Sequence, residues 1–402
     1  MKSQIPATLV GMLACTASLA ARPMLPVDSA ASASRALAVA LGLQDSVRYP
    51  FEQMIDGARG IAVRSLAILG ASTTPAAAMQ GVTLACPLSG TLTAKLSRLP
   101  LRRLSITWDD CASLIENQEI LSYDGKGELV LGANSFDADF LLLLQLGNAD
   151  EKFVETWRST ESDPGREERV FALGAIGRVP LTQDAGRYLG QFFYALDGEL
   201  EWRFIPSDAA GAPPGSRLLQ TAKNLVVRGA TTWLEAQQVL DEDLTISGST
   251  QGMHFPGLAP PELQDRFSAQ DFRVHRTSRP DKPYFDTVTV DGRIDYLWTP
   301  GGAQGCGDGR YSFRTLVPIV HGLNGSLQSF AQGKIVLNGA ATATFLPGDG
   351  PAPPEWYTPG PDERPTLVRI DMGSAGVYEH TSFAPLVTLP IYDGCFDDEA
   401  VD

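Results

Sequence analysis

Histidine is scarce in this sequence, and the histidines have no partners at a catalytic or metal-binding spacing. The four are His254, His275, His321 and His380. The usual zinc patterns are absent, because no His-x-His or His-x-x-x-His pair occurs and no two cysteines stand two to four residues apart. The chain also lacks a Gly-x-Ser-x-Gly turn, a P-loop and a dinucleotide-binding turn. We therefore expect a non-enzymatic protein with no catalytic residue and no cofactor, and the sequence leaves metal binding unknown.

Long apolar runs are missing after the first 20 residues. Even the apolar segment Phe140 to Leu146 is far shorter than the roughly 20 residues that a membrane-spanning helix needs. Positive charge is also in deficit, since the formal net charge is −15. Such a surface repels phosphate backbones and anionic lipid headgroups. We expect no transmembrane span and no nucleic-acid partner.

The N-terminus has the order of a secretory signal peptide. Lys2 is followed by an apolar stretch from Ile5 to about Leu19 and then by the small residue Ala20. Cleavage after Ala20 predicts a periplasmic or extracellular protein. The alternative is lipoprotein processing before Cys15, which would anchor the chain in the outer membrane through a lipid.

Four cysteines remain after residues 1–20 are removed, and an exported chain with an even number of cysteines favours disulfides. They are Cys86, Cys111, Cys306 and Cys395. Cys86 and Cys111 flank a segment that reads as a hairpin about Arg98 and Leu99, so we expect these two to pair. By elimination Cys306 would pair with Cys395.

Three segments differ in their patterns. Residues 1–20 form the signal peptide, and residues 21–80 form a helical segment and linker. In this second segment helical spacing predicts two short helices separated by Pro50. Residues 81–402 have strand-like alternation and predict an antiparallel β domain. Within it the Pro-rich stretches 206–216 and 346–365 predict surface loops.

Asp-Gly and Asn-Gly dipeptides recur in the β segment and are a strong hairpin signal, because tight turns need positive φ angles. They are Asp124-Gly125, Asp197-Gly198, Asp291-Gly292 and Asn324-Gly325. The clearest predicted hairpins are centred on Gly198 and Gly292. Their irregular spacing argues against a solenoid or propeller. The predicted fold is mainly β, a large antiparallel hairpin-rich sheet or sandwich with a short N-terminal helical segment.

Two strand-like segments, 139–146 and 190–196, are apolar on both faces and must be covered on both sides. The structural interpretation is a two-layer core or a strand covered by the N-terminal helices. The functional interpretation is a sheet face that holds an apolar ligand. The candidate ligand contacts are Phe140, Leu142, Leu144, Phe192, Tyr194 and His275; His275 would share a strand face with Arg273 and could help to hold an anion.

These patterns favour an exported envelope protein that binds a hydrophobic, lipid-like small molecule or an envelope protein through a β-sheet face. One alternative is a structural or adhesive cell-surface protein that uses its Pro-rich loops. The other is a hydrolase with an unconventional site, for which the histidines and acidic turns are the only material.

Overall fold

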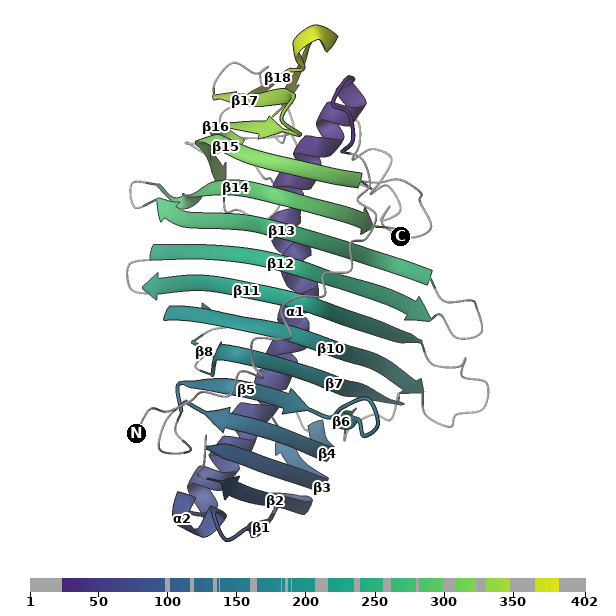
Figure 1. The fold of residues 1–402 in the computed structure, drawn as a ribbon, viewed down its shortest axis with the longest axis vertical. Helices are drawn as coiled ribbons and strands as arrows, with labels where there is room; N and C mark the ends of the chain where they lie inside the picture. Colours follow the sequence, from purple (N-terminus) through teal and green to yellow (C-terminus); the bar gives the residue numbers. More distant parts are fainter. Residues whose placement is uncertain are drawn as a thin grey trace, which may run out of the picture.

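The fold consists of one long helix and one very large antiparallel sheet (Figure 1). It was obtained as a computed structural model, which describes residues 24–97, 102–115, 119–132, 136, 138–159, 165–181, 183–184, 187–188, 190–206, 216–234, 239–255, 262–279, 282–298, 309–322, 330–347 and 366–382. The predicted signal peptide, Cys15, Asn324-Gly325, Cys306 and Cys395 lie outside these residues, as do 207–215 and 348–365 of the Pro-rich stretches.

The helical elements are α1 (Ala30–Ser72), α2 (Pro75–Ala78) and the short 3-10 turn η6 (Gly373–Ala375). The strands of the first part are β1 (Val82–Ala85), β2 (Ser89–Ser97), β3 (Arg103–Ile115), β4 (Glu119–Leu131), β5 (Phe140–Leu146), β6 (Phe153–Ser159), β7 (Gly165–Pro180), β8 (Gln183–Asp184) and β9 (Arg187–Tyr188). Those of the second part are β10 (Gly190–Pro206), β11 (Arg217–Leu234), β12 (Val239–Phe255), β13 (Glu262–Arg279), β14 (Lys282–Trp298), β15 (Gly309–Gly322), β16 (Phe330–Leu337), β17 (Ala341–Pro347), β18 (Thr366–Asp371) and β19 (Val377–Ser382).

Seventeen of the strands form a single antiparallel meander, and β8 and β9 make a separate two-stranded sheet. Strands β5 and β6 share one position between β4 and β7, because each pairs with a different half of both neighbours. From β10 to β19 each strand pairs with the next one in the chain. The predicted fold class, mainly β with a large antiparallel sheet, is confirmed.

Helix α1 crosses one face of the sheet along its long axis (Figure 1). Its N-terminus is capped by Ser29, whose side chain accepts a hydrogen bond from the Ser32 backbone N–H. Apolar residues from one stripe of the helix are buried against the sheet, among them Leu37, Phe51 and Leu69. A helix of 43 residues is about 65 Å long. The sheet extends over roughly 70 Å at a strand spacing of about 4.8 Å, so α1 covers nearly all of it.

The prediction of two short helices was wrong, because α1 continues through Pro50. A proline inside a helix removes one backbone hydrogen bond and usually bends or ends the helix. Here both flanks bury apolar side chains on the same sheet, with Leu37 and Ala40 before the proline and Phe51 and Met54 after it. Tertiary packing thus outweighs the local preference.

The prediction that Asp-Gly dipeptides form hairpin turns was wrong at each dipeptide that the structure describes. Gly125, Gly198 and Gly292 lie in the middle of β4, β10 and β14, with φ angles of 126°, 130° and 110°. Both halves of β10 pair with the same neighbours, β7 and β11, instead of with each other. The glycines with positive φ angles therefore lie at β-bulges within continuous strands and not in hairpin turns.

A bulge in β11 illustrates how these strands keep one apolar face. The pairing shifts between Leu196 and Gly198, and Asn224 on β11 is the inserted residue, with a φ of 48°. The Asn224 backbone N–H donates to Asp197 Oδ1 at 2.6 Å. Similar bonds join Asp271 N–H to Ser247 and Thr315 N–H to Asp291. Without the inserted Asn224, the side-chain alternation would send half of the apolar residues of β11 away from α1.

The predicted disulfide between Cys86 and Cys111 is confirmed. The hairpin that carries it is formed by β2 and β3, where Ser97 pairs with Arg103, so the connection is longer than the two-residue turn that we expected. Closing a loop of this sequence separation, 25 residues, stabilises the fold by about 3 kcal/mol in the chain-entropy picture. In the part of the chain that the structure describes, no helix has the length and apolar character needed to cross a bilayer.

Candidate ligand site on the outer face of the sheet

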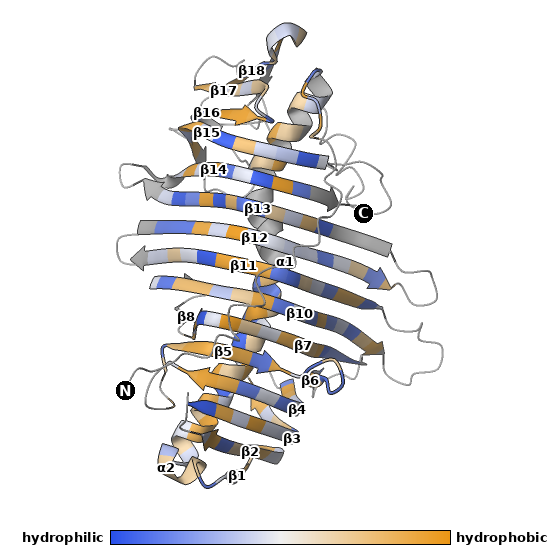
Figure 2. Cartoon of the chain, viewed as in Figure 1, coloured by the Kyte–Doolittle hydropathy of each residue, from blue (hydrophilic) through white to orange (hydrophobic). Residues whose placement is uncertain are grey.

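The sheet has two faces with different surroundings. The face that packs against α1 is called the α1 face here, and the opposite one the outer face. Along β10, Phe192, Tyr194 and Leu196 are buried on the α1 face, whereas Phe193 between them points away from it. Figure 2 shows that several strands carry hydrophobic residues at consecutive positions, and β5 is orange along most of its length. Consecutive strand residues point to opposite faces, so β5 has apolar residues on both.

Large apolar side chains are exposed next to one another on β5, β7 and β10. Leu142, Ile176 and Phe193 are 38%, 58% and 45% exposed, and we call them the outer patch. The strands are neighbours: Leu143, which follows Leu142, pairs with Ile176, and Ile176 pairs with Ala195. Contiguous exposed apolar surface on a folded protein marks a contact site more often than single exposed residues do.

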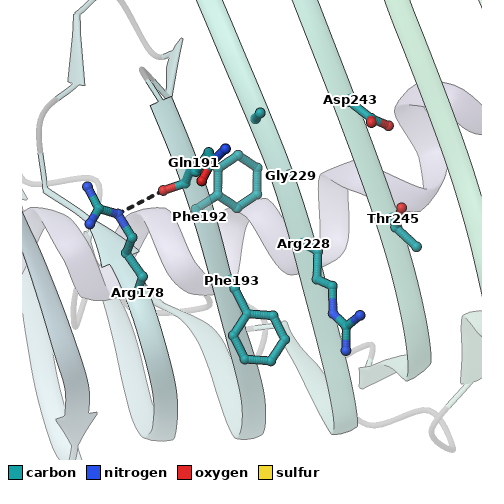
Figure 3. Close-up of a pocket in the computed structure, with 9 residues that line it drawn as sticks. Arg178, Gln191, Phe192, Phe193, Arg228, Gly229, Asp243 and Thr245 are labelled. Atoms are coloured by element: carbon teal, nitrogen blue, oxygen red, sulfur yellow. Dashed lines mark hydrogen bonds between the residues drawn. The ribbon is translucent and has the colours of Figure 1, made fainter.

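Two arginines flank Phe193 and are called the arginine pair. Arg178 on β7 and Arg228 on β11 are its direct cross-strand partners (Figure 3). The Arg228 guanidinium lies 5.0 Å from the centre of the Phe193 ring, and that of Arg178 lies 4.0 Å from the centre of the Phe140 ring. Arg178 Nε donates to the carbonyl oxygen of Gln191 at 2.9 Å. Among the described residues no carboxylate forms an ion pair with either arginine.

Arg178, Phe193 and Arg228 line an open, shallow depression of about 540 Å³. Its lining also includes Gln191, Ala230, Asp243 and Thr245, which lie on β10, β11 and β12. The volume falls within the range of roughly 300–1,000 Å³ that small-molecule sites occupy. The depression therefore combines apolar surface with two guanidinium groups.

An ion pair closes the far side of this depression. Arg273 on β13 donates two hydrogen bonds to the Asp243 carboxylate, at 2.8 and 2.7 Å. These bonds hold the pKa of Asp243 below its usual value, against a smaller opposing effect of burial. Arg273 and His275 lie on the same strand face, as the sequence suggested. The Arg273 guanidinium is already bound to the Asp243 carboxylate.

A second group of charged residues lies beneath α1. Glu155 on β6 is fully buried, and its carboxylate is 3.3 Å from Arg169 on β7 and 3.9 Å from Arg64 on α1. The Arg169 guanidinium lies 5.1 Å from the Trp157 ring centre and 4.1 Å from that of Trp202. Burial raises the pKa of Glu155, and the arginines oppose that shift. This cluster joins α1 to the sheet.

The predicted ligand contacts divide between the two faces. Leu144, Phe192 and Tyr194 are buried on the α1 face. Leu142 belongs to the outer patch, and half-buried Phe140 lies under the Arg178 guanidinium. His275 is the cross-strand neighbour of Asp243 at the rim of the depression. The sequence analysis missed Phe193 and the arginine pair. The alternation of Gln191 to Leu196 places Phe193 on the face opposite Phe192 and Tyr194 without showing which face is exposed. Arg178 and Arg228 are 50 residues apart, and only strand pairing brings them together.

Within the described residues, no three histidine, cysteine or acidic side chains come together as a metal site would require. The fold and site define a β protein with one dominant sheet, in which a helix covers one face and an apolar, cationic depression lies on the other. Comparisons with protein-family models, with curated proteins and with solved structures gave no match for this chain. The functional argument therefore depends on the residues of the depression.

Proposed function

We propose that this chain is an exported, non-enzymatic envelope protein that binds a hydrophobic, lipid-like molecule on the outer face of its sheet. The observation that carries the proposal is the outer patch, in which three large apolar side chains from adjacent strands are exposed and one of them, Phe193, lines a depression of small-molecule size.

The arrangement of the two faces supports this choice of site. Helix α1 covers the apolar residues of the other face along nearly the whole sheet (Figure 1). An external ligand on the α1 face would have to displace that helix, whereas a ligand on the outer patch would meet side chains that are already exposed.

The export part of the proposal has separate support. The Cys86–Cys111 disulfide suits an oxidising compartment, and the N-terminal order of Lys2, an apolar stretch and Ala20 suits a signal peptide.

The test uses an uncharged fluorescent dye, N-phenyl-1-naphthylamine, whose emission rises in apolar surroundings. We expect the mature protein to bind the dye. Phe193→Ser should bind it at least about tenfold more weakly, since that change removes the aromatic ring that the bound dye would cover. Leu316→Ser is the matched control, because Leu316 is 47% exposed on β15, away from the patch. Absence of dye binding by the unchanged protein, or equal binding by Phe193→Ser, would refute the proposal.

A further inference from the structure

We infer that the molecule bound at the outer patch is an anionic amphiphile, whose acidic head lies between Arg178 and Arg228 and whose apolar chain lies along Phe193 and Ile176. This inference rests on the proposed function and adds the chemical class of the ligand. The shared chemistry is a phosphate or carboxylate head on a hydrocarbon chain.

Charge is the first argument. The chain carries a formal net charge of −15, so most cations have acidic neighbours available. Several other outer-face arginines are paired: Arg273 with Asp243, and both Arg203 and Arg217 with Glu201. The arginine pair departs from this pattern, since neither guanidinium has a carboxylate partner among the described residues. Asp243 also lines the depression, but its carboxylate is bound to Arg273, so the two like charges of the arginine pair favour an anion between them.

Geometry is the second argument. Arg178 and Arg228 are both opposite Phe193, one on each side of β10, so their backbones are about 10 Å apart. In the structure Arg178 extends toward Gln191 and the Phe140 ring, and the Arg228 guanidinium lies over the Phe193 ring (Figure 3), so both side chains must turn inward to donate to one phosphate or carboxylate. Guanidinium groups match these anions with paired hydrogen bonds.

The size of the depression distinguishes a small amphiphile from a large polyanion or a protein. At about 540 Å³ it suits a single small molecule. A nucleic acid needs a row of several cations to neutralise its phosphates, and here Asp243 stands next to the pair. A stable protein interface needs about 800 Å² on each partner, well beyond three exposed side chains.

The first experiment compares four probes by isothermal titration with the mature protein, each below its micelle concentration. They are dodecyl phosphate, dodecyltrimethylammonium, dodecyl maltoside and inorganic phosphate. We expect dodecyl phosphate to bind at least about tenfold more tightly than either of the other two dodecyl compounds. We expect inorganic phosphate to bind far more weakly than dodecyl phosphate, because it lacks the chain.

The second experiment uses variants. Arg178→Gln and Arg228→Gln should each weaken dodecyl phosphate binding about fivefold, the factor for an exposed charge-assisted contact, and weaken dodecyl maltoside binding much less. Arg314→Gln is the matched control: it removes the same charge from the same outer-face row, four strands from Arg228. Asp243→Asn should tighten dodecyl phosphate binding, because it removes a negative charge and releases Arg273.

The outcomes separate the two proposals. If no dodecyl compound binds, the proposed function fails. If all three bind equally, or if Arg228→Gln behaves like Arg314→Gln, the apolar site stands and the anionic head is refuted. If inorganic phosphate binds as tightly as dodecyl phosphate, the depression is a site for free anions, and the amphiphile is refuted.

Discussion

At the residue scale, the charged side chains of the outer face fall into two kinds. Asp243 and Arg273 satisfy each other through two hydrogen bonds between adjacent strands. The arginine pair, one and three strands away from Asp243, has aromatic and carbonyl neighbours in place of acids. The first kind contributes to stability and the second is available for a ligand, so the two can be separated by experiment.

The Asp243–Arg273 pair should make stability depend on pH in a specific window. Arg273 lowers the pKa of Asp243 in the folded protein below its reference value of 3.8. The stabilisation is therefore complete above pH 3.8 and is lost as pH falls through the lower folded pKa. We expect Asp243→Asn to lower the free energy of unfolding by up to about 1 kcal/mol near neutral pH, because the pair is largely exposed.

Urea unfolding from neutral pH down to about pH 3 measures this effect, and the difference between the two proteins should shrink at the acidic end. The control is the Arg273→Gln background, in which the pH-dependent effect of Asp243→Asn should be much smaller, because only burial and His275 then act on the pKa of Asp243. A difference that stays constant with pH, or that is undiminished in this background, would contradict the assignment.

Much of the candidate site was out of reach of the sequence for a physical reason. The segments around Leu142 and Phe193 are apolar on both strand faces. The alternation alone therefore does not show which face is buried against the rest of the protein and which is exposed. The position of α1 decides that question. Phe192 and Tyr194, which looked like ligand contacts, pack against the helix side, and Phe193 between them is the exposed residue.

At the element scale, the bulges are the feature that the sequence conceals. Both a tight hairpin turn and a β-bulge can require a glycine with positive φ. The sequence around Asp197-Gly198 and Asp291-Gly292 is therefore compatible with either structure. What differs is the pairing of the flanking residues, which depends on strands far away in the chain. The Cys86–Cys111 hairpin was predictable because its two strands are adjacent in the sequence and pair with each other.

The requirement for glycine at the bulges can be tested at Gly292. It has a φ of 110°, and an added Cβ would lie 2.3 Å from the Asp271 carbonyl oxygen. Gly292→Ala should therefore lower the free energy of unfolding by at least about 2 kcal/mol through backbone strain and this contact. Thermal and urea unfolding followed by circular dichroism give the value.

Gly174→Ala is the control for this prediction. Gly174 lies within β7, and an added Cβ would meet no atom within 4 Å. Its substitution should be neutral or stabilising by about 0.5 kcal/mol, because alanine reduces the freedom of the unfolded chain. Equal effects of the two changes would mean that Gly292 has no special role.

At the scale of the whole molecule, α1 joins the two ends of a sheet that would otherwise be held together only by neighbour-to-neighbour pairing. The helix contacts β16 as well as β5, and the chain before it reaches β15 and the β16–β17 turn, where Asn338 Nδ2 donates to the Leu25 carbonyl. In a meander each strand touches mainly its neighbours, so a local disturbance could stay local. A continuous helix across nearly all strands gives a reason for distant strands to unfold together.

Hydrogen exchange can measure this coupling. Leu37 and Leu66 lie in opposite halves of α1 and are 0% and 5% exposed, so truncating either to alanine should lower stability by about 2–5 kcal/mol. We expect each substitution to lower amide protection in β2–β4 and in β16–β18 alike, because loosening one half of α1 weakens the shared core. Val63→Ala, at a position 41% exposed on the same helix, is the control and should leave protection unchanged. If each substitution affected only the strands nearest to it, the sheet would be a series of independently unfolding parts, and the helix would not couple its ends.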